Sequence, residues 1–141
     1  MTDPAPRIGA VLETAIYVDD LSRAGRFYEE TLGLAPLVRD ARMWAFDCGP
    51  GSVLLAFLRG TTAETLHLPG GEIPPHEGMG RLHFALAIAA DDLGAWEARL
   101  ARMGVSIEAR MNWPRGGKSL YFRDPDHNLV ELATPGLWVN Y

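Results

Sequence analysis

Three side chains that can bind a metal occur in similar surroundings at three places in the chain. Glu13, His83 and Glu131 each lie in a short apolar segment of the kind that forms a β-strand. Side chains alternate between the two faces of a strand, so the neighbours on each face can be assigned from the sequence. The residues that share a face with these three are mostly small, whereas the opposite faces are bulky and apolar. Each strand is therefore predicted to pack under a helix and to present one metal ligand toward a cavity.

Convergence of these three side chains would suit a divalent metal ion. An unpaired charge in a cavity is costly, and a shared metal would provide the missing partner. One imidazole and two carboxylates favour Mn, Fe, Co, Ni or Zn over a metal that prefers thiolates. Three protein ligands leave positions open for water and substrate, and Glu131 or Glu13 could also act as a general base. Taken singly, each residue has an ordinary structural interpretation, so the hypothesis depends on the three occurring together.

Other residues could contribute to a substrate pocket, because such pockets are mostly apolar with a few polar groups. The candidates are Trp44, Phe46, Phe57, Trp113, Arg115 and Tyr121. The aromatic residues have a core position as the alternative, and Arg115 has a solvated surface position. His67 and His76 lie in a Gly- and Pro-rich linker. Either could cover the site, or both could be exposed surface residues, and the sequence leaves their role open.

The elements that would position these residues occur twice in the chain. The first half reads as a strand at 11–18, a helix from about 22 to 32, and strands at 36–39, 43–47 and 52–58. The second half reads as a strand at 82–89, a helix from 91 or 92 to about 103, and strands at 105–110, 118–122 and 128–133. Gly33 and Gly104 are predicted to end the two helices in a left-handed conformation. Residues 60–80 are predicted to be an irregular linker.

Composition sets the class of protein. The 141 residues carry a net charge of −5, and this acidic balance argues against nucleic acid as a partner. No apolar run reaches the roughly 18 residues of a membrane span, and the N-terminus lacks the apolar core of a signal peptide. The single cysteine, Cys48, excludes an intrachain disulfide. We therefore expect a cytoplasmic protein that acts on a small molecule.

Three segments resemble the glyoxalase/bleomycin-resistance/dioxygenase family, which is the vicinal oxygen chelate superfamily. They are ETAIYVDDLSRAGRFYEETLGL, IPPHEGMGRLHFALAI and SLYFRDPDHNLVELATPG, and the resemblance spans roughly residues 8–136. It implies an α+β fold in which two paired βαβββ modules form one cupped mixed sheet. The single domain, 1–141, would contain module 1 at about 8–60, a linker at about 61–80, module 2 at about 81–134 and a tail at 135–141.

The resemblance also implies where the metal ligands lie. They belong at the start of the first strand and in the last strand of each module, which here are Glu13, Leu55, His83 and Glu131. Glu13 stands where His or Gln is common, and Leu55 cannot bind a metal. The set is therefore closer to the three-ligand sites of fosfomycin-resistance and extradiol dioxygenase members than to a four-ligand glyoxalase I site.

Two functions follow from the resemblance. The first is a metal-dependent lyase, isomerase or dioxygenase that acts on a small substrate with two neighbouring oxygens, with thiol addition as a related reaction. The alternative is a metal-free, bleomycin-resistance-like protein that sequesters a small molecule or an antibiotic. Family members of this length usually form homodimers, and Trp138 in the apolar tail would suit an interface.

Overall fold

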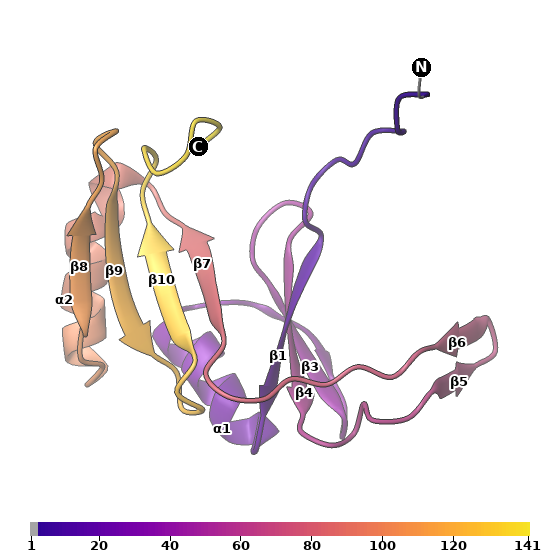
Figure 1. The fold of residues 1–141 in the computed structure, drawn as a ribbon. Helices are drawn as coiled ribbons and strands as arrows, with labels where there is room; N and C mark the ends of the chain where they lie inside the picture. Colours follow the sequence, from indigo (N-terminus) through magenta and orange to yellow (C-terminus); the bar gives the residue numbers. More distant parts are fainter. Residues whose placement is uncertain (1–2) are drawn as a thin grey trace.

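The computed structural model describes residues 3–141, which form two similar halves (Figure 1). The first half contains β1 (Glu13–Val18), α1 (Leu21–Arg26), a π-helical turn (Phe27–Thr31), β2 (Pro36–Arg39), β3 (Met43–Asp47) and β4 (Val53–Leu58). The second contains β7 (His83–Ala87), a 3-10 turn (Ala90–Asp92), α2 (Leu93–Arg102), β8 (Ala109–Asn112), β9 (Lys118–Arg123) and β10 (Leu129–Ala133). This order confirms the predicted α+β class and the repeated βαβββ arrangement.

Each half forms its own four-stranded sheet with the same strand order. The first sheet runs β1-β4-β3-β2 and the second runs β7-β10-β9-β8. In each sheet the first strand of the half pairs in parallel with the last, so Glu13 lies opposite Val53 and His83 lies opposite Leu129. The remaining neighbours in both sheets are antiparallel. The strands that begin with Glu13 and His83 are therefore edge strands.

The linker between the halves is more regular than predicted. Strands β5 (Leu66–Leu68) and β6 (Gly71–Ile73) form an antiparallel hairpin that projects away from both sheets (Figure 1). Leu68 pairs with Gly71, so Pro69 and Gly70 form a two-residue turn. A Pro-Gly pair is well suited to a tight turn, because Pro fixes φ and Gly accepts the conformation that follows. The prediction of an irregular segment was wrong for this hairpin. Pro69 and Gly70 end one strand and begin the turn, but they do not prevent strands on either side of it.

Several element boundaries test the sequence predictions. Gly33 and Gly104 have φ values of 71° and 73°, which confirms the left-handed ends of both helices. Strand β8 begins later than predicted, because Val105 and Ile107 pack against the core before the strand pairing starts. Helix α2 ends at Arg102, close to the predicted end, and Met103 is 42% exposed. No helix among residues 3–141 combines the length and apolarity needed to cross a membrane.

One hydrophobic core joins the two halves. The apolar faces of both sheets and the inner faces of both helices belong to a single cluster of buried side chains. Tyr28 in the π-helical turn is fully buried within it. Its ring lies 5.6 Å from the ring of Phe46 in the first sheet and 6.3 Å from that of Phe84 in the second. Burial of each such side chain contributes roughly 1.5–3 kcal/mol, so the two halves stabilise each other.

A buried polar network crosses the same boundary. The Tyr28 hydroxyl donates to Oδ2 of Asp124 at 2.6 Å, and Asn128 Nδ2 donates to the same oxygen at 2.9 Å. Oδ1 of Asp124 accepts the backbone N–H of Asn128 at 2.8 Å. Asn128 Oδ1 in turn accepts the N–H of Leu82 at 3.0 Å. Since Leu82 precedes β7 directly, this network connects α1 to the strand that carries His83.

Two arginines strengthen the attachment of α1 to the second half. Arg99 of α2 donates from Nε and Nη2 to the backbone carbonyls of Thr31 and Glu30, each at 2.7 Å. These carbonyls lie at the end of the π-helical turn, where backbone acceptors lack partners within the helix. Arg23 of α1 forms an ion pair with the buried side chain of Asp126 at 3.0 Å. The helix of the first half is thus fixed to the sheet of the second.

We predict that Tyr28→Phe lowers the free energy of unfolding by about 1–3 kcal/mol, because a buried carboxylate loses a donor. Burial raises the pKa of the Tyr28 phenol well above its ordinary value of 10.0, and the Asp124 charge raises it further. The phenol's contribution is therefore complete below about pH 10 and declines as the pH rises above it. Urea unfolding at several pH values measures both effects. Tyr141→Phe, at a partly exposed hydroxyl, is the control and should cost less; equal losses in the two variants would contradict the prediction.

Candidate metal centre

The structure brings together two of the three predicted ligands, His83 and Glu131. The His83 Nε2 and Glu131 Oε1 atoms lie 3.3 Å apart on the face of the second sheet that α2 does not cover. The His83 Nδ1 atom lies 2.9 Å from the backbone carbonyl of Leu129. A carbonyl oxygen only accepts hydrogen bonds, so Nδ1 carries a proton, and Nε2 is the ring nitrogen that can bind a metal beside Glu131. Metal-binding histidines are oriented in this way.

Glu131 is a buried carboxylate with a fixed orientation. Its side chain is only 7% exposed, whereas that of His83 is 49% exposed. The Ser119 hydroxyl donates to Glu131 Oε2 at 2.5 Å, and Trp113 Nε1 donates to the Ser119 oxygen at 2.8 Å. This chain of hydrogen bonds occupies one carboxylate oxygen and leaves the other beside the imidazole. The pair therefore presents one nitrogen and one oxygen that can bind a metal at a partly open position.

Two predicted pocket residues, Trp113 and Tyr121, surround this pair. Tyr121 lies opposite Glu131 in the β9–β10 register, and its ring centroid is 6.3 Å from that of His83. Burial raises the pKa of the Tyr121 phenol, and the Glu131 charge raises it further. The third predicted residue of this half, Arg115, is exposed in the turn between β8 and β9. Arg115 therefore has the solvated surface position that was the alternative to a pocket position.

Glu13 lies on the other sheet, apart from the pair. It is exposed at the start of β1 and lines a cavity of about 560 Å³ together with Leu55 and Phe57 of β4. Within residues 3–141, no group of three or more His, Cys, Asp or Glu side chains is close enough to hold a metal ion. One chain therefore assembles two of the expected ligands and presents the third on a separate face.

Trp44 and Phe46 lie on the opposite face of β3 from this cavity. Phe46 is fully buried against Tyr28, and the ring of Trp44 fills the space beside Gly25 of α1. A Cβ atom at Gly25 would lie 2.0 Å from this ring, so the helix packs directly on it. Both rings therefore have the core position that was the alternative to a pocket position, because the alternation in β3 directs them under the helix. Of the three pocket candidates in this half, only Phe57 lines the cavity.

Sequence reasoning missed the contribution of Tyr17 and left His76 undecided. The Tyr17 hydroxyl and His76 Nδ1 lie 2.7 Å apart, and both residues line the cavity that contains Glu13. The alternation of β1 contained the signal for Tyr17, because it shares a strand face with Glu13 and Ala15. His67, the other linker histidine, instead pairs with Glu72 in the exposed β5–β6 hairpin at 3.0 Å.

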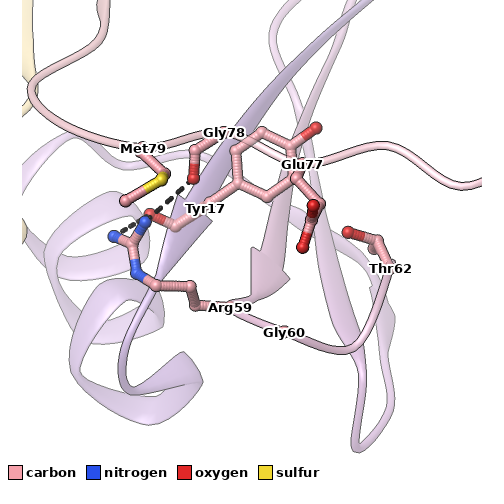
Figure 2. Close-up of a pocket in the computed structure, with 7 residues that line it drawn as sticks. All are labelled: Tyr17, Arg59, Gly60, Thr62, Glu77, Gly78 and Met79. Carbon is pink, nitrogen blue, oxygen red and sulfur yellow. Dashed lines mark hydrogen bonds between the residues drawn. The ribbon is translucent and has the colours of Figure 1, made fainter. Parts of the chain in front are cut away.

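A smaller cavity of about 230 Å³ lies beside Tyr17 and is crossed by the linker (Figure 2). Arg59 donates to the backbone carbonyls of Gly78 at 3.0 Å and Tyr17 at 3.1 Å, as the dashed lines in Figure 2 show. It also pairs with Asp19 at 2.8 Å. Each side-chain nitrogen of Arg59 therefore has a partner. These contacts attach the linker to β1 and fix the segment that carries His76.

Comparisons with known proteins agree with this fold. The family model of the Glyoxalase/Bleomycin resistance protein/Dioxygenase superfamily matches residues 10–132. The chain is 30% identical over 128 residues to the uncharacterized protein YraH of Bacillus subtilis, which covers 86% of this chain and 95% of that protein. It is 32% identical over 118 residues to the metallothiol transferase FosB of Bacillus licheniformis, which covers 83% of this chain and 70% of that protein.

A solved structure adds a match in three dimensions. The crystal structure of a lactoylglutathione lyase from Agrobacterium tumefaciens superimposes with a TM-score of 0.85 at 30% identity, and covers 95% of this chain and 99% of that one. The family match extends over most of the chain, from before β1 into β10. The protein therefore belongs to the Glyoxalase/Bleomycin resistance protein/Dioxygenase superfamily.

Proposed function

We propose that the protein is a divalent-metal-dependent enzyme of the lyase, isomerase or dioxygenase type that acts on a small substrate with two neighbouring oxygen atoms. The single observation that carries the proposal is the His83–Glu131 pair, in which a carbonyl fixes the imidazole tautomer and a hydroxyl fixes the carboxylate. These donors suit Mn, Fe, Ni, Co or Zn. The names of the relatives, a metallothiol transferase and a lactoylglutathione lyase, favour thiol or thiol-adduct chemistry over dioxygenation.

We infer that a second copy of the chain supplies the third ligand. His83, Ala85 and Ala87 are all exposed along one face of β7, and Glu13 is exposed on β1. A homodimer that covers these faces would place Glu13 of the partner subunit beside the His83–Glu131 pair. By two-fold symmetry, this contact would form two equal sites.

Apolar side chains near both ends of the described chain support this pairing. Ile8 and Val11 precede β1, and Trp138 and Val139 follow β10. All four are at least 70% exposed in the single chain. Clusters of exposed apolar side chains mark interfaces, and their burial would favour association.

The residues of the site would have different roles in the reaction. When bound, a divalent metal supplies Lewis-acid polarisation of the two substrate oxygens. His83 and Glu131 are held in place by their own hydrogen bonds and would keep a fixed geometry. Glu13 makes no ion pair or side-chain hydrogen bond with residues 3–141. Its carboxylate is therefore freer than that of Glu131 to accept a proton from the substrate.

One observation favours a second candidate, a metal-free protein that sequesters a small molecule. Leu55 stands where the family resemblance implies a fourth ligand, and it lines the 560 Å³ cavity with Phe57. A cavity of this size and apolar character can enclose a drug-sized molecule without any metal. Metal content therefore discriminates between the two functions.

We predict that the purified protein binds one divalent metal per chain and that chelation abolishes turnover. His83→Ala and Glu13→Ala should each weaken metal binding by at least about 100-fold, because removal of even an indirect partner of a ligand costs 10–100-fold. Elemental analysis and metal titration measure this. Glu108→Ala is the control, since that carboxylate is exposed and pairs with Arg123 in the second half. The sequestering function would be supported instead if the protein bound no metal and its variants bound small molecules as the native chain does.

The shared site makes a separate prediction about mixed dimers. Glu13→Ala and His83→Ala chains should each be inactive alone. After the two are unfolded and refolded together, about half of the dimers should be mixed. Each mixed dimer would contain one site with all three native ligands and one with two substitutions, so about a quarter of native activity and metal content should return. Native mass spectrometry of the refolded mixture, with one variant labelled with ¹⁵N, calibrates the fraction of mixed dimers. Absence of recovery despite proven exchange would show that the site does not form between chains.

A further inference from the structure

We propose that Arg42 and His76 bind a carboxylate group of the substrate, at the end of the cavity that lies farthest from Glu13. The proposal rests on the proposed function, because it describes the other end of the molecule whose oxygens would bind the metal. It defines the substrate class as an elongated small molecule with two neighbouring oxygens at one end and a carboxylate at the other.

The cavity has two chemically different ends. Glu13, Ala15 and Tyr17 occupy successive positions on one face of β1, and Tyr17 lies opposite Phe57 of β4. Four residues along a strand span about 13 Å, so Tyr17 is that far from Glu13. Between the two ends, Ala15 pairs with Leu55 and gives the floor an apolar middle. The cavity volume of about 560 Å³ lies within the range of small-molecule sites.

His76 is held at the far end by contacts to its backbone and its ring. Its N–H donates to the Thr62 carbonyl at 3.0 Å, and the buried Thr62 hydroxyl donates to its carbonyl. The ring packs edge-on against Phe57, with centroids 4.8 Å apart. The Tyr17 hydroxyl can donate to Nδ1, which leaves the ring proton on Nε2. Nε2 has no hydrogen-bond partner among residues 3–141, so a ligand in the cavity can accept its proton.

Arg42 provides the positive charge at this end. Its guanidinium carbon lies 5.3 Å from the centre of the same Phe57 ring, and its Nε makes only a long hydrogen bond, 3.4 Å, to the Thr61 carbonyl. It forms no ion pair with a carboxylate of residues 3–141. Arg59, by contrast, already pairs with Asp19. Arg42 is therefore the arginine of this cavity whose charge a ligand can neutralise.

The donor set matches a carboxylate in charge and geometry. A guanidinium is permanently charged and can bind both oxygens of a carboxylate through parallel hydrogen bonds. A neutral imidazole adds one further N–H donor. One fixed positive charge balances one negative charge, so a carboxylate fits this end better than a doubly charged phosphate. The apolar floor between Ala15 and Leu55 suits a hydrocarbon segment that connects the two polar ends of the substrate.

The test compares ligands that differ only in the terminal group. In the metal-loaded protein, suberic acid monohydroxamate carries both a hydroxamate, which has two neighbouring oxygens, and a carboxylate. Octanohydroxamic acid lacks the carboxylate. We expect the carboxylate to tighten binding about tenfold, since hydrogen bonds between charged groups contribute at this level. Arg42→Gln should abolish the preference and His76→Gln should reduce it. Arg110→Gln, which alters an exposed arginine paired with Glu97 in the second half, should leave it unchanged.

A second arm separates this proposal from the metal site. In chelator-treated protein, octanoate and octanamide are titrated while the NMR signals of the Arg42 Nε–H and the His76 ring are followed. Stronger responses to octanoate would support the carboxylate site even if hydroxamates fail to bind through a metal. Hydroxamate binding with no carboxylate preference, or equal responses to octanoate and octanamide, would overturn the proposal and leave the metal site intact. Retention of the preference in Arg42→Gln would also overturn it.

Discussion

The hydrogen bonds around the buried Asp124 carboxylate connect the fold to the site. Asp124 accepts from Tyr28 of the first half and from Asn128 beside β10, and Asn128 also accepts the N–H of Leu82 at the entry to β7. Leu82 in turn accepts the N–H of Leu129 at 2.8 Å, which sets the register of β7 against β10. That register places His83 opposite Leu129, whose carbonyl fixes the imidazole, and near Glu131. The side-chain bonds of Asp124 and Asn128 are buried or partly buried, so a missing partner there would carry its full desolvation cost.

The same constraint decides which faces of the protein remain open. Because α1 packs against both sheets, the apolar faces of the two halves share one core within a single chain. The opposite faces, with mostly small side chains and the proposed metal ligands, are then directed away from that core. Glu13 and the His83–Glu131 pair consequently lie on different exposed surfaces. The proposed pairing of two chains would complete such a site and would cover the exposed apolar residues near both ends of the described chain.

The sequence predicted those parts of the fold that depend on local pattern. Strand alternation assigned the core faces of β1, β7 and β10 correctly, since Ile16, Phe84 and Val130 are buried. It also linked His83 to Glu131, whose strands become neighbours through the module repeat. It left Trp44 and Phe46 open between a core and a pocket position, because bulky residues in β3 are compatible with either until the position of α1 is known. The position of His76 was likewise hidden, because long-range contacts with Thr62 and of Arg59 with Gly78 determine it.

Locating the metal itself is the most direct test of the proposed site. Crystals grown with Mn²⁺ and measured at its absorption edge would show its position by anomalous scattering. We expect a peak about 2.0–2.2 Å from His83 Nε2 and from a carboxylate oxygen of Glu131, with a carboxylate oxygen of the partner's Glu13 as the third protein ligand. A peak bound by other side chains, or no peak in crystals that are saturated with the metal, would contradict the central claim.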